Sequence, residues 1–180
     1  GLGEFFYKNK LNPHNSPKFP FVKDTKTTNY SLPTTNSRCL VGIGGGKDSI
    51  VAAELLKEGH FDITAFSIQT GRESKLIDTI IDTIDIKNLK IQRVLDPKVF
   101  DAHAYDGHVP ISAIYAFLGV LSAVLYKYSY VIVGNEYSSN FGNIRYKGQM
   151  INHQWSKSFE FETLFDDYLK NIISPDVYYF

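Results

Sequence analysis

Short apolar runs alternate with stretches of helical periodicity along the chain from residue 38 onward. The runs expected to form strands cover residues 38–43, 61–68, 89–95 and 130–133. Apolar residues recur at helical spacing over residues 47–59, 77–84, 111–126 and 161–172. Strands that alternate with helices predict an α/β fold, a parallel twisted sheet with helices on both faces.

The carboxyl ends of parallel strands meet at one edge of a sheet, and ligands bind outside that edge. This rule gathers at one rim the residues that follow the predicted strands: 44–49, 67–72, 96–108 and those from 135 onward. We therefore expect the functional chemistry of the chain to lie in these segments.

Residues 1–36 have a different character. They are rich in Asn, Lys and Pro, and Pro13, Pro17, Pro20 and Pro33 oppose regular structure. Several aromatic residues in this stretch are too many for a purely disordered tail. We expect an extended arm or linker over residues 1–36, lying on a single domain of residues 37–180.

Composition narrows the class of protein. The chain has 180 residues, 43% of them hydrophobic, and a formal net charge of zero, which predicts a globular core and no broad basic field for nucleic acid. The apolar run 111–126 is shorter than the ~20 residues of a membrane span, so we expect a buried helix and no membrane partner. A single cysteine, Cys39, excludes an internal disulfide framework, and no signal-peptide pattern is present; both favour the cytoplasm.

The most informative segment is the glycine-rich stretch Gly-Ile-Gly-Gly-Gly-Lys-Asp-Ser at 42–49, between a predicted strand and a predicted helix. Unobstructed backbone amides and the positive end of a helix make such a turn a site for phosphate. A Walker A loop is excluded because Val41 occupies its first glycine position and Asp48 follows Lys47. A dinucleotide fingerprint is excluded because Lys47 replaces its third glycine and the second strand ends without an acidic residue.

This turn resembles the PP-loop of the ATP pyrophosphatase superfamily, Ser-Gly-Gly-x-Asp-Ser. Gly45, Gly46, Lys47, Asp48 and Ser49 match its last five positions, and Gly44 replaces the leading serine. The resemblance implies an adenine nucleotide alpha hydrolase-like fold and an enzyme that splits ATP between the α and β phosphates. It also implies that residues 44–49, together with Ser67, bind the nucleotide and that Asp48 positions Mg²⁺.

Three further segments are unusually polar for connections between core elements: residues 106–112, 134–140 and 152–158. Their amides, hydroxyls, imidazoles and one ammonium group suit the recognition of a polar substrate. The alternative is that they are solvated loops with turn-forming Asn and Ser.

These segments give a narrower resemblance. Together with the glycine turn, Gly-His-Val-Pro-Ile-Ser-Ala at 107–113, Gly-Asn-Glu at 134–136 and Asn-His-Gln-Trp-Ser-Lys-Ser at 152–158 resemble the UDP-N-acetylmuramoyl-L-alanyl-L-glutamate epimerase family. The resemblance runs from about residue 12 to the end, and it departs from the family at Tyr137, where a basic residue is expected. It implies the C-terminal PP-loop catalytic domain of such an enzyme, with an N-terminal domain missing; the absence of an initiating Met also indicates a piece of a longer protein.

The same resemblance implies a reaction and roles. ATP and Mg²⁺ would drive inversion of the terminal L-glutamate of a UDP-muropeptide, with release of AMP and pyrophosphate. His108 and His153 are the candidates for moving the α-proton, with Glu136 in reserve, and Lys157 would neutralise the substrate carboxylate or the α-phosphate. The candidates for binding the peptide are Asn135, Ser138, Asn140, Gln154, Ser156 and Ser158.

Two other readings stay open. One is a different adenylating enzyme: a ligase, an amidotransferase partner or a tRNA-thiolating enzyme, although a single strand cysteine and zero net charge argue against thiolation. The other is a non-catalytic nucleotide-binding module. The presence of Lys47, Asp48 and Ser49 argues against it.

Overall fold

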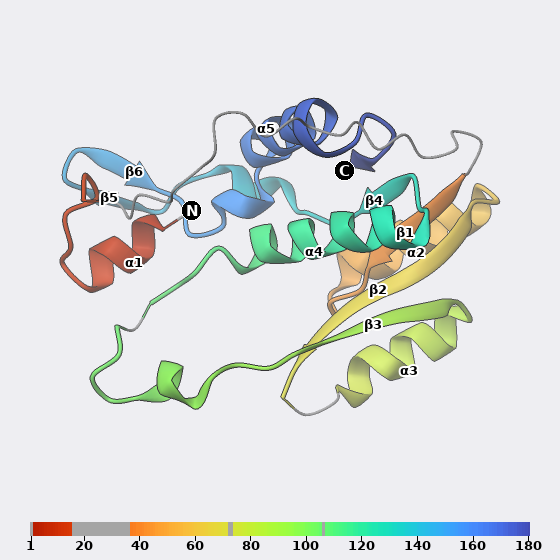
Figure 1. Ribbon diagram of the computed structural model, residues 1–180, viewed down its shortest axis with the longest axis horizontal. Coiled ribbons are helices and arrows are strands. Elements are labelled where there is room, and N and C mark those ends of the chain that lie inside the picture. Colours follow the sequence, from red (N-terminus) through yellow and green to blue (C-terminus); the bar gives the residue numbers. More distant parts are fainter. Residues whose placement is uncertain (1, 16–36, 72–73, 106) are drawn as a thin grey trace.

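A computed structural model describes residues 2–15, 37–71, 74–105 and 107–180 (Figure 1). Its centre is a five-stranded sheet in which every neighbouring pair is parallel and the order is β3-β2-β1-β4-β7. The strands are β1 (Arg38–Gly42), β2 (Asp62–Thr70), β3 (Lys87–Arg93), β4 (Tyr130–Ile132) and β7 (Tyr178–Tyr179). The predicted α/β class is therefore confirmed.

Helices cover both faces of the sheet, with α4 in front of it and α2 behind it in Figure 1. The helices are α2 (Lys47–Glu58), α3 (Lys75–Ile84), α4 (Ile111–Tyr126) and α5 (Phe159–Tyr168), which continues as the π-helical turn η4 (Leu169–Ile173). The side chains of β1 alternate between the two layers: Leu40 packs with α4 and α5, whereas Cys39 and Val41 pack with α2 and α3. This alternation is the two-residue period of a strand with both faces covered.

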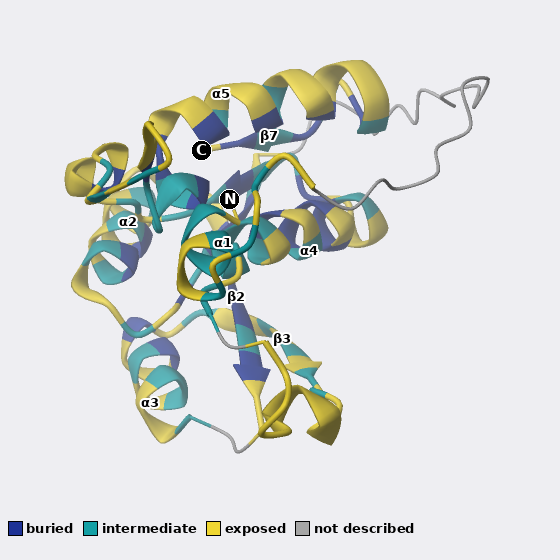
Figure 2. Ribbon diagram, turned by 90° about the vertical axis from the view of Figure 1, so that its left-hand side faces the viewer, coloured by how far each residue is buried: buried dark blue, intermediate teal, exposed yellow. Residues whose placement is uncertain are grey.

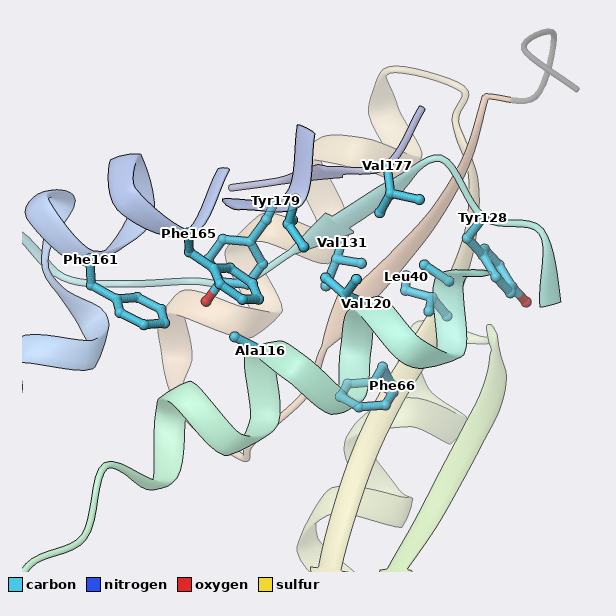
Figure 3. Close-up of a cluster of buried hydrophobic side chains, with 12 residues drawn as sticks. Leu40, Phe66, Ala116, Val120, Tyr128, Val131, Phe161, Phe165, Val177 and Tyr179 are labelled. Carbon is cyan, nitrogen blue, oxygen red and sulfur yellow. The ribbon is translucent and has the colours of Figure 1, made fainter. Parts of the chain in front are cut away.

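The first of these cores is drawn in Figure 3, where Phe161 and Phe165 of α5 lie beside Tyr179 of β7 and above Ala116 of α4. The rings of Phe165 and Tyr179 meet edge to face, with centroids 5.0 Å apart. The aromatic C-terminal residues, which the sequence pattern does not assign to any element, therefore form the edge strand β7 and complete this core.

Chain order reverses at the middle of the sheet. From β1 the chain moves to β2 and β3 on one side, and β4 and β7 lie on the other. Consequently the segments that follow β1 and β4 run in different directions and leave a crevice between them. Ligands are expected to bind there in this topology.

The N-terminal stretch differs in part from the predicted extended arm. Residues 3–8 form a short helix, α1 (Gly3–Lys8), which lies ahead of the first proline of the stretch and is therefore not opposed by it. It packs near the small antiparallel pair of β5 (Ile144–Tyr146) and β6 (Gln149–Ile151), where Tyr7 and Tyr146 meet edge to face. Residues 16–36 of the predicted arm lie outside the described residues.

Helix α4 was expected to be buried, and this is wrong for one side of it. Its inner residues Ala116, Val120 and Ala123 are buried, but Phe117, Leu121 and Leu125 are about half or more exposed. Figure 2 shows the exposed positions as an outer stripe along α4. Among the described residues, no helix combines the length and apolarity that crossing a bilayer requires.

Candidate functional site

A pocket of about 420 Å³ lies at the carboxyl ends of β1 and β4, where the sheet topology predicts a ligand. We call it the central pocket. Its wall comes from five segments far apart in sequence: the glycine turn, the start of α4, the residues after β4, the short helix η3 (Trp155–Lys157) and the C-terminal strand. The lining residues include Gly44, Gly46, Asp48, Ser49, Ser112, Gly134, Asn135, Lys157 and Tyr179.

The glycine turn has the geometry of an anion site. Gly45 adopts φ +90°, which L-residues with a side chain rarely tolerate, and this bends the chain sharply from β1 into α2. Gly46 is the N-cap and has no side chain to bond the first amides of the helix. The first-turn N–H groups of α2 therefore keep their donor capacity for a ligand.

Ser49 is placed at the pocket but its hydroxyl is engaged. It is almost fully buried, and its Oγ donates to the Gly46 carbonyl at 2.7 Å, one turn earlier. A hydrogen bond from Ser49 to a bound phosphate would therefore require this hydroxyl to rotate. Lys47 is exposed and, unlike Asp48, does not line the pocket.

Gly134 explains how the end of β4 reaches the start of α2. A Cβ on this glycine would lie 2.6 Å from the Asp48 carbonyl carbon and 2.8 Å from the Ser49 nitrogen. Real Cβ atoms do not approach a backbone so closely, so only glycine allows this contact. The Gly-Asn-Glu segment at 134–136 is thus held against the glycine turn, as the predicted convergence of these segments requires.

A second helix also begins at this pocket. Helix α4 starts after Pro110, makes no side-chain cap hydrogen bond, and presents Ile111 and Ser112 to the cavity. Two helix N-termini and the ammonium group of Lys157 therefore face a space in which Asp48 supplies a negative charge. The positive potential of such an arrangement favours a polyanion.

A narrow apolar recess of about 90 Å³ opens beside the central pocket. It shares Gly42, Gly44, Tyr115 and Val133 with that pocket and is otherwise walled by Ile43, Phe66, Ile68 and Val131. Such a recess suits the edge of an apolar ring rather than a charged group.

Ser67 does not lie at the pocket. Strand β2 continues to Thr70, beyond the predicted end, so Ser67 falls inside the strand. It is only 1% exposed and its Oγ donates to Asn88 of β3 at 3.0 Å. Its predicted role in nucleotide binding is therefore wrong, and the carboxyl ends of β2 and β3 line a separate hollow around Thr70 and Arg93.

A second cavity, the outer groove, adjoins the central pocket. It has a volume of about 530 Å³ and is lined by Asn135, Glu136, Tyr137, Asn140, Phe141, Lys157, Phe159 and Glu162. Asn135 and Lys157 line both cavities, so the two hollows meet at these side chains. A larger cavity of about 680 Å³ lies between α1 and β6 and includes no residue of the glycine turn.

Two side chains that sequence analysis missed each line one of these cavities. Tyr179 lines the central pocket and its phenol is hydrogen-bonded to Asn135; burial, and then the nearby charge of Glu162, raise the pKa of the phenol. Glu162 lines the outer groove, and burial followed by repulsion from Asp166 raises the pKa of its carboxyl group. Both residues fall in segments that the sequence presents only as core-forming, which hides them.

His108 and His153 are brought together although 45 positions separate them in the numbering. Their rings meet edge to face, with centroids 5.9 Å apart, and the His153 Nδ1 atom is buried with no hydrogen-bond partner among the described residues. The preceding glycine, Gly107, packs on Phe5 of α1. Neither histidine is among the described residues that line the central pocket or the outer groove.

Two bases that invert an α-carbon approach it from opposite sides, each aiming a ring nitrogen at it. His108 and His153 are neighbours but line neither cavity, so the acid–base role expected of them stays a prediction.

Several predicted peptide-binding residues have structural roles. Ser158 is the N-cap of α5: its Oγ accepts from the Phe161 amide and donates to the Trp155 carbonyl. Asn140 donates to the Tyr137 carbonyl and accepts from the Phe159 amide, so both ends of its amide group are used. Ser156 is buried, and neither it, Ser138 nor Gln154 lines either cavity.

A metal site built by the protein alone is not found. Within the described ranges no group of three or more His, Cys, Asp or Glu side chains could hold an ion. Asp48 is the one predicted metal ligand and lines the central pocket. Mg²⁺ is commonly held by one or two carboxylates together with substrate phosphates, so a single aspartate fits that mode of binding.

Comparison with solved structures finds likenesses that are distant in sequence. The U34-tRNA thiolase NcsA from Methanococcus maripaludis is 18% identical, with a TM-score of 0.41, over 62% of this chain and 42% of that one. A predicted subunit of a tRNA methyltransferase from Methanocaldococcus jannaschii is 17% identical, with a TM-score of 0.40, over 79% and 66%.

Comparison with curated proteins is more specific. A UDP-N-acetyl-alpha-D-muramoyl-L-alanyl-L-glutamate epimerase of Xanthomonas oryzae pv. oryzae is 35% identical over 183 aligned residues, which cover 100% of this chain and 40% of the relative. The protein of the same name from Salinispora tropica is 36% identical over 91% of this chain and 36% of its own length. The chain thus spans about two fifths of the length of the curated relatives it matches.

A family model settles which part of such proteins this chain resembles. The expected assignment to a C-terminal domain is wrong, because the model of the MurL N-terminal domain matches residues 1–180. The match includes the first 36 residues, which the sequence pattern had set apart as an arm. Since it extends over the whole sequence, this chain belongs to the MurL N-terminal domain family.

Proposed function

We propose that this chain is the nucleotide-binding part of an ATP-dependent epimerase that inverts the terminal L-glutamate of UDP-MurNAc-L-Ala-L-Glu through adenylation of its carboxylate. The observation that carries the proposal is the central pocket, where two uncapped helix starts and Lys157 face one cavity. The names of the curated relatives support the choice of substrate.

The phosphates and the base of ATP would meet different parts of the pocket wall. The phosphates would lie on the amides at the start of α2, with Asp48 as the protein ligand of a phosphate-bound Mg²⁺. The apolar recess by Tyr115 would take an edge of the base. Lys157, at the junction of the two cavities, would neutralise the acceptor carboxylate or the α-phosphate as the two approach.

Adenylation makes the inversion accessible. A carboxylate oxygen of the acceptor attacks the α-phosphorus, the bond from that phosphorus to the bridging oxygen breaks, and pyrophosphate leaves. The negative charge beside the α-carbon is thereby removed, and the acyl group can delocalise the electron pair left when the α-proton is taken. A proton returned to the opposite face of the α-carbon completes the inversion, and hydrolysis of the acyl adenylate by water then releases AMP. General acid–base groups contribute only ~10²–10⁴ to a rate, so this activation must supply much of the remainder.

The experiment is to supply the chain with ATP, Mg²⁺ and UDP-MurNAc-L-Ala-L-Glu and follow radiolabelled pyrophosphate exchanging into ATP. Exchange that depends on the muropeptide is the expected result, because it reports reversible adenylation. Nucleotide binding without any acceptor-dependent exchange would favour a non-catalytic module, and exchange with other carboxylic acids only would favour a different adenylating enzyme.

A further inference from the structure

The meeting of the two cavities constrains how an acceptor must lie, if the proposed function holds. A carboxylate that attacks the α-phosphorus has to sit beside the phosphates, and therefore near Asn135 and Lys157, which line both hollows. The rest of the acceptor then extends into the outer groove. The polar side chains of that groove consequently face the atoms next to the carboxylate.

Three polar residues of the outer groove lie beyond the junction: Glu136, Asn140 and Glu162. Asn140 is occupied at both ends by backbone partners, and Glu136 is exposed to solvent. Glu162 is the partly buried one, standing one helical turn from Asp166 on α5. It is therefore the side chain best placed to contact an acceptor away from bulk water.

Glu162 has no hydrogen-bond donor of its own. No described residue donates to its carboxylate or pairs with it, while Asp166 lies close enough to repel it. The neighbouring phenol of Tyr179 bonds to Asn135. Partial burial without a donor disfavours the charged carboxylate, which is why its pKa is raised. A ligand that brings an N–H group would remove this disadvantage.

We propose that the outer groove binds an α-amino-acid carboxylate whose nitrogen carries a hydrogen, with Lys157 pairing with the carboxylate and Glu162 accepting a hydrogen bond from the N–H. An ammonium group offers only donors and a carboxylate only acceptors, so the two residues select opposite groups on the ligand. Exposed rings of Tyr137, Phe141 and Phe159 line the groove and offer apolar surface to the substituent on that nitrogen.

The test uses two probes that differ in one atom: N-acetyl-L-alanyl-L-glutamate and the ester analogue in which oxygen replaces the glutamate N–H. Each is titrated calorimetrically into the chain already saturated with Mg²⁺ and α,β-methylene ATP. Loss of the N–H should weaken binding to the wild type by about 10- to 100-fold, the usual effect of a hydrogen bond to a charged group. In Glu162→Ala the peptide should bind as weakly as the ester, within about twofold.

Glu58→Ala is the matched control, because Glu58 is exposed at the far end of α2 and lines neither cavity. It should preserve the wild-type preference for the peptide. An equal preference in wild type and Glu162→Ala, no preference in the wild type, or no peptide binding to the nucleotide-loaded chain would each overturn the inference. Failure of the nucleotide itself to bind would instead refute the proposed function.

Discussion

The close approach of Gly134 to the start of α2 allows a single methyl group to test the central pocket. In Gly134→Ala the added Cβ would meet the Asp48 carbonyl carbon at 2.6 Å and the Asp48 oxygen at 2.7 Å. Ordinary carbon contacts lie at ~3.5–4.0 Å, so the end of β4 and the first turn of α2 must separate by about 1 Å. Both sides of the contact are backbone, so no side-chain rotation can relieve it.

Two effects of different size follow from this separation. Overpacking of this kind costs about 1–3 kcal/mol of unfolding free energy, which corresponds to a fall in Tm of about 2–12 °C for a chain of this size. Displacement of the first-turn amides should also remove at least one hydrogen bond to a phosphate, which weakens MgATP binding by about 10- to 100-fold.

Thermal melts and calorimetric titration of MgATP measure the two effects separately. Gly59→Ala is the control, because its Cβ would meet the Leu55 carbonyl oxygen at an acceptable 3.4 Å and crowd only the ring of Phe61, which is 44% exposed and can move aside. It should leave MgATP affinity unchanged. The reasoning is refuted if folded Gly134→Ala binds MgATP as tightly as the wild type, or if Gly59→Ala weakens binding equally.

The other predictions concern stability and reactivity. Ser158→Ala removes the cap of α5 and should cost about 1 kcal/mol in a denaturant titration, and Ser158→Asp should restore most of it; equal loss in both variants would exclude the cap. Burial and the charge of Asp62 raise the pKa of Cys39 to about 11, so this thiol, 1% exposed, should resist iodoacetamide at pH 8 until the chain unfolds; rapid alkylation of the native chain would contradict its placement. The raised pKa of Glu162 means that the folded state binds the proton more tightly than the unfolded state does. Ionisation of Glu162 therefore lowers the free energy of unfolding, from the unfolded pKa upward and in full above the folded pKa. Glu162→Gln should therefore be more stable than wild type near neutral pH, with the difference vanishing below the ordinary glutamate pKa of about 4.3; a constant difference across pH would refute the assignment.

Local patterns of the sequence predicted most of the sheet. The apolar runs place β1, β2 and β4 within a few residues, and the glycine turn falls between β1 and α2 as expected. These elements are specified by short-range periodicity and by the conformational demand of Gly45, both of which are visible in one sequence. Strand β7 was missed because its two residues, Tyr178–Tyr179, are too few to show the alternation that identifies a strand in a sequence.

Part of the lining of the site was predictable: Asp48, Asn135 and Lys157 line the central pocket as their polar segments led us to expect. The glycine turn and Gly134 reveal themselves because glycine is required by geometry. Ser67 was expected at the ligand-binding edge of the sheet, but β2 continues to Thr70 and Ser67 lies inside the strand. The length of a strand, and not the type of residue, decides whether a hydroxyl reaches that edge. Glu162 and Tyr179 were hidden because a residue at helical or strand spacing gives no sign that its polar end faces a cavity. Such contacts between distant segments depend on packing that no local pattern records.

The measurement that bears most directly on the account is a calorimetric titration of the folded chain with MgATP, AMP and adenosine. A phosphate site at the helix starts and Lys157, as proposed, predicts that affinity falls in the order MgATP, AMP, adenosine and weakens as salt is raised. Equal affinity for adenosine and MgATP, or no uptake of MgATP by the folded chain, would contradict a phosphate site at residues 44–49.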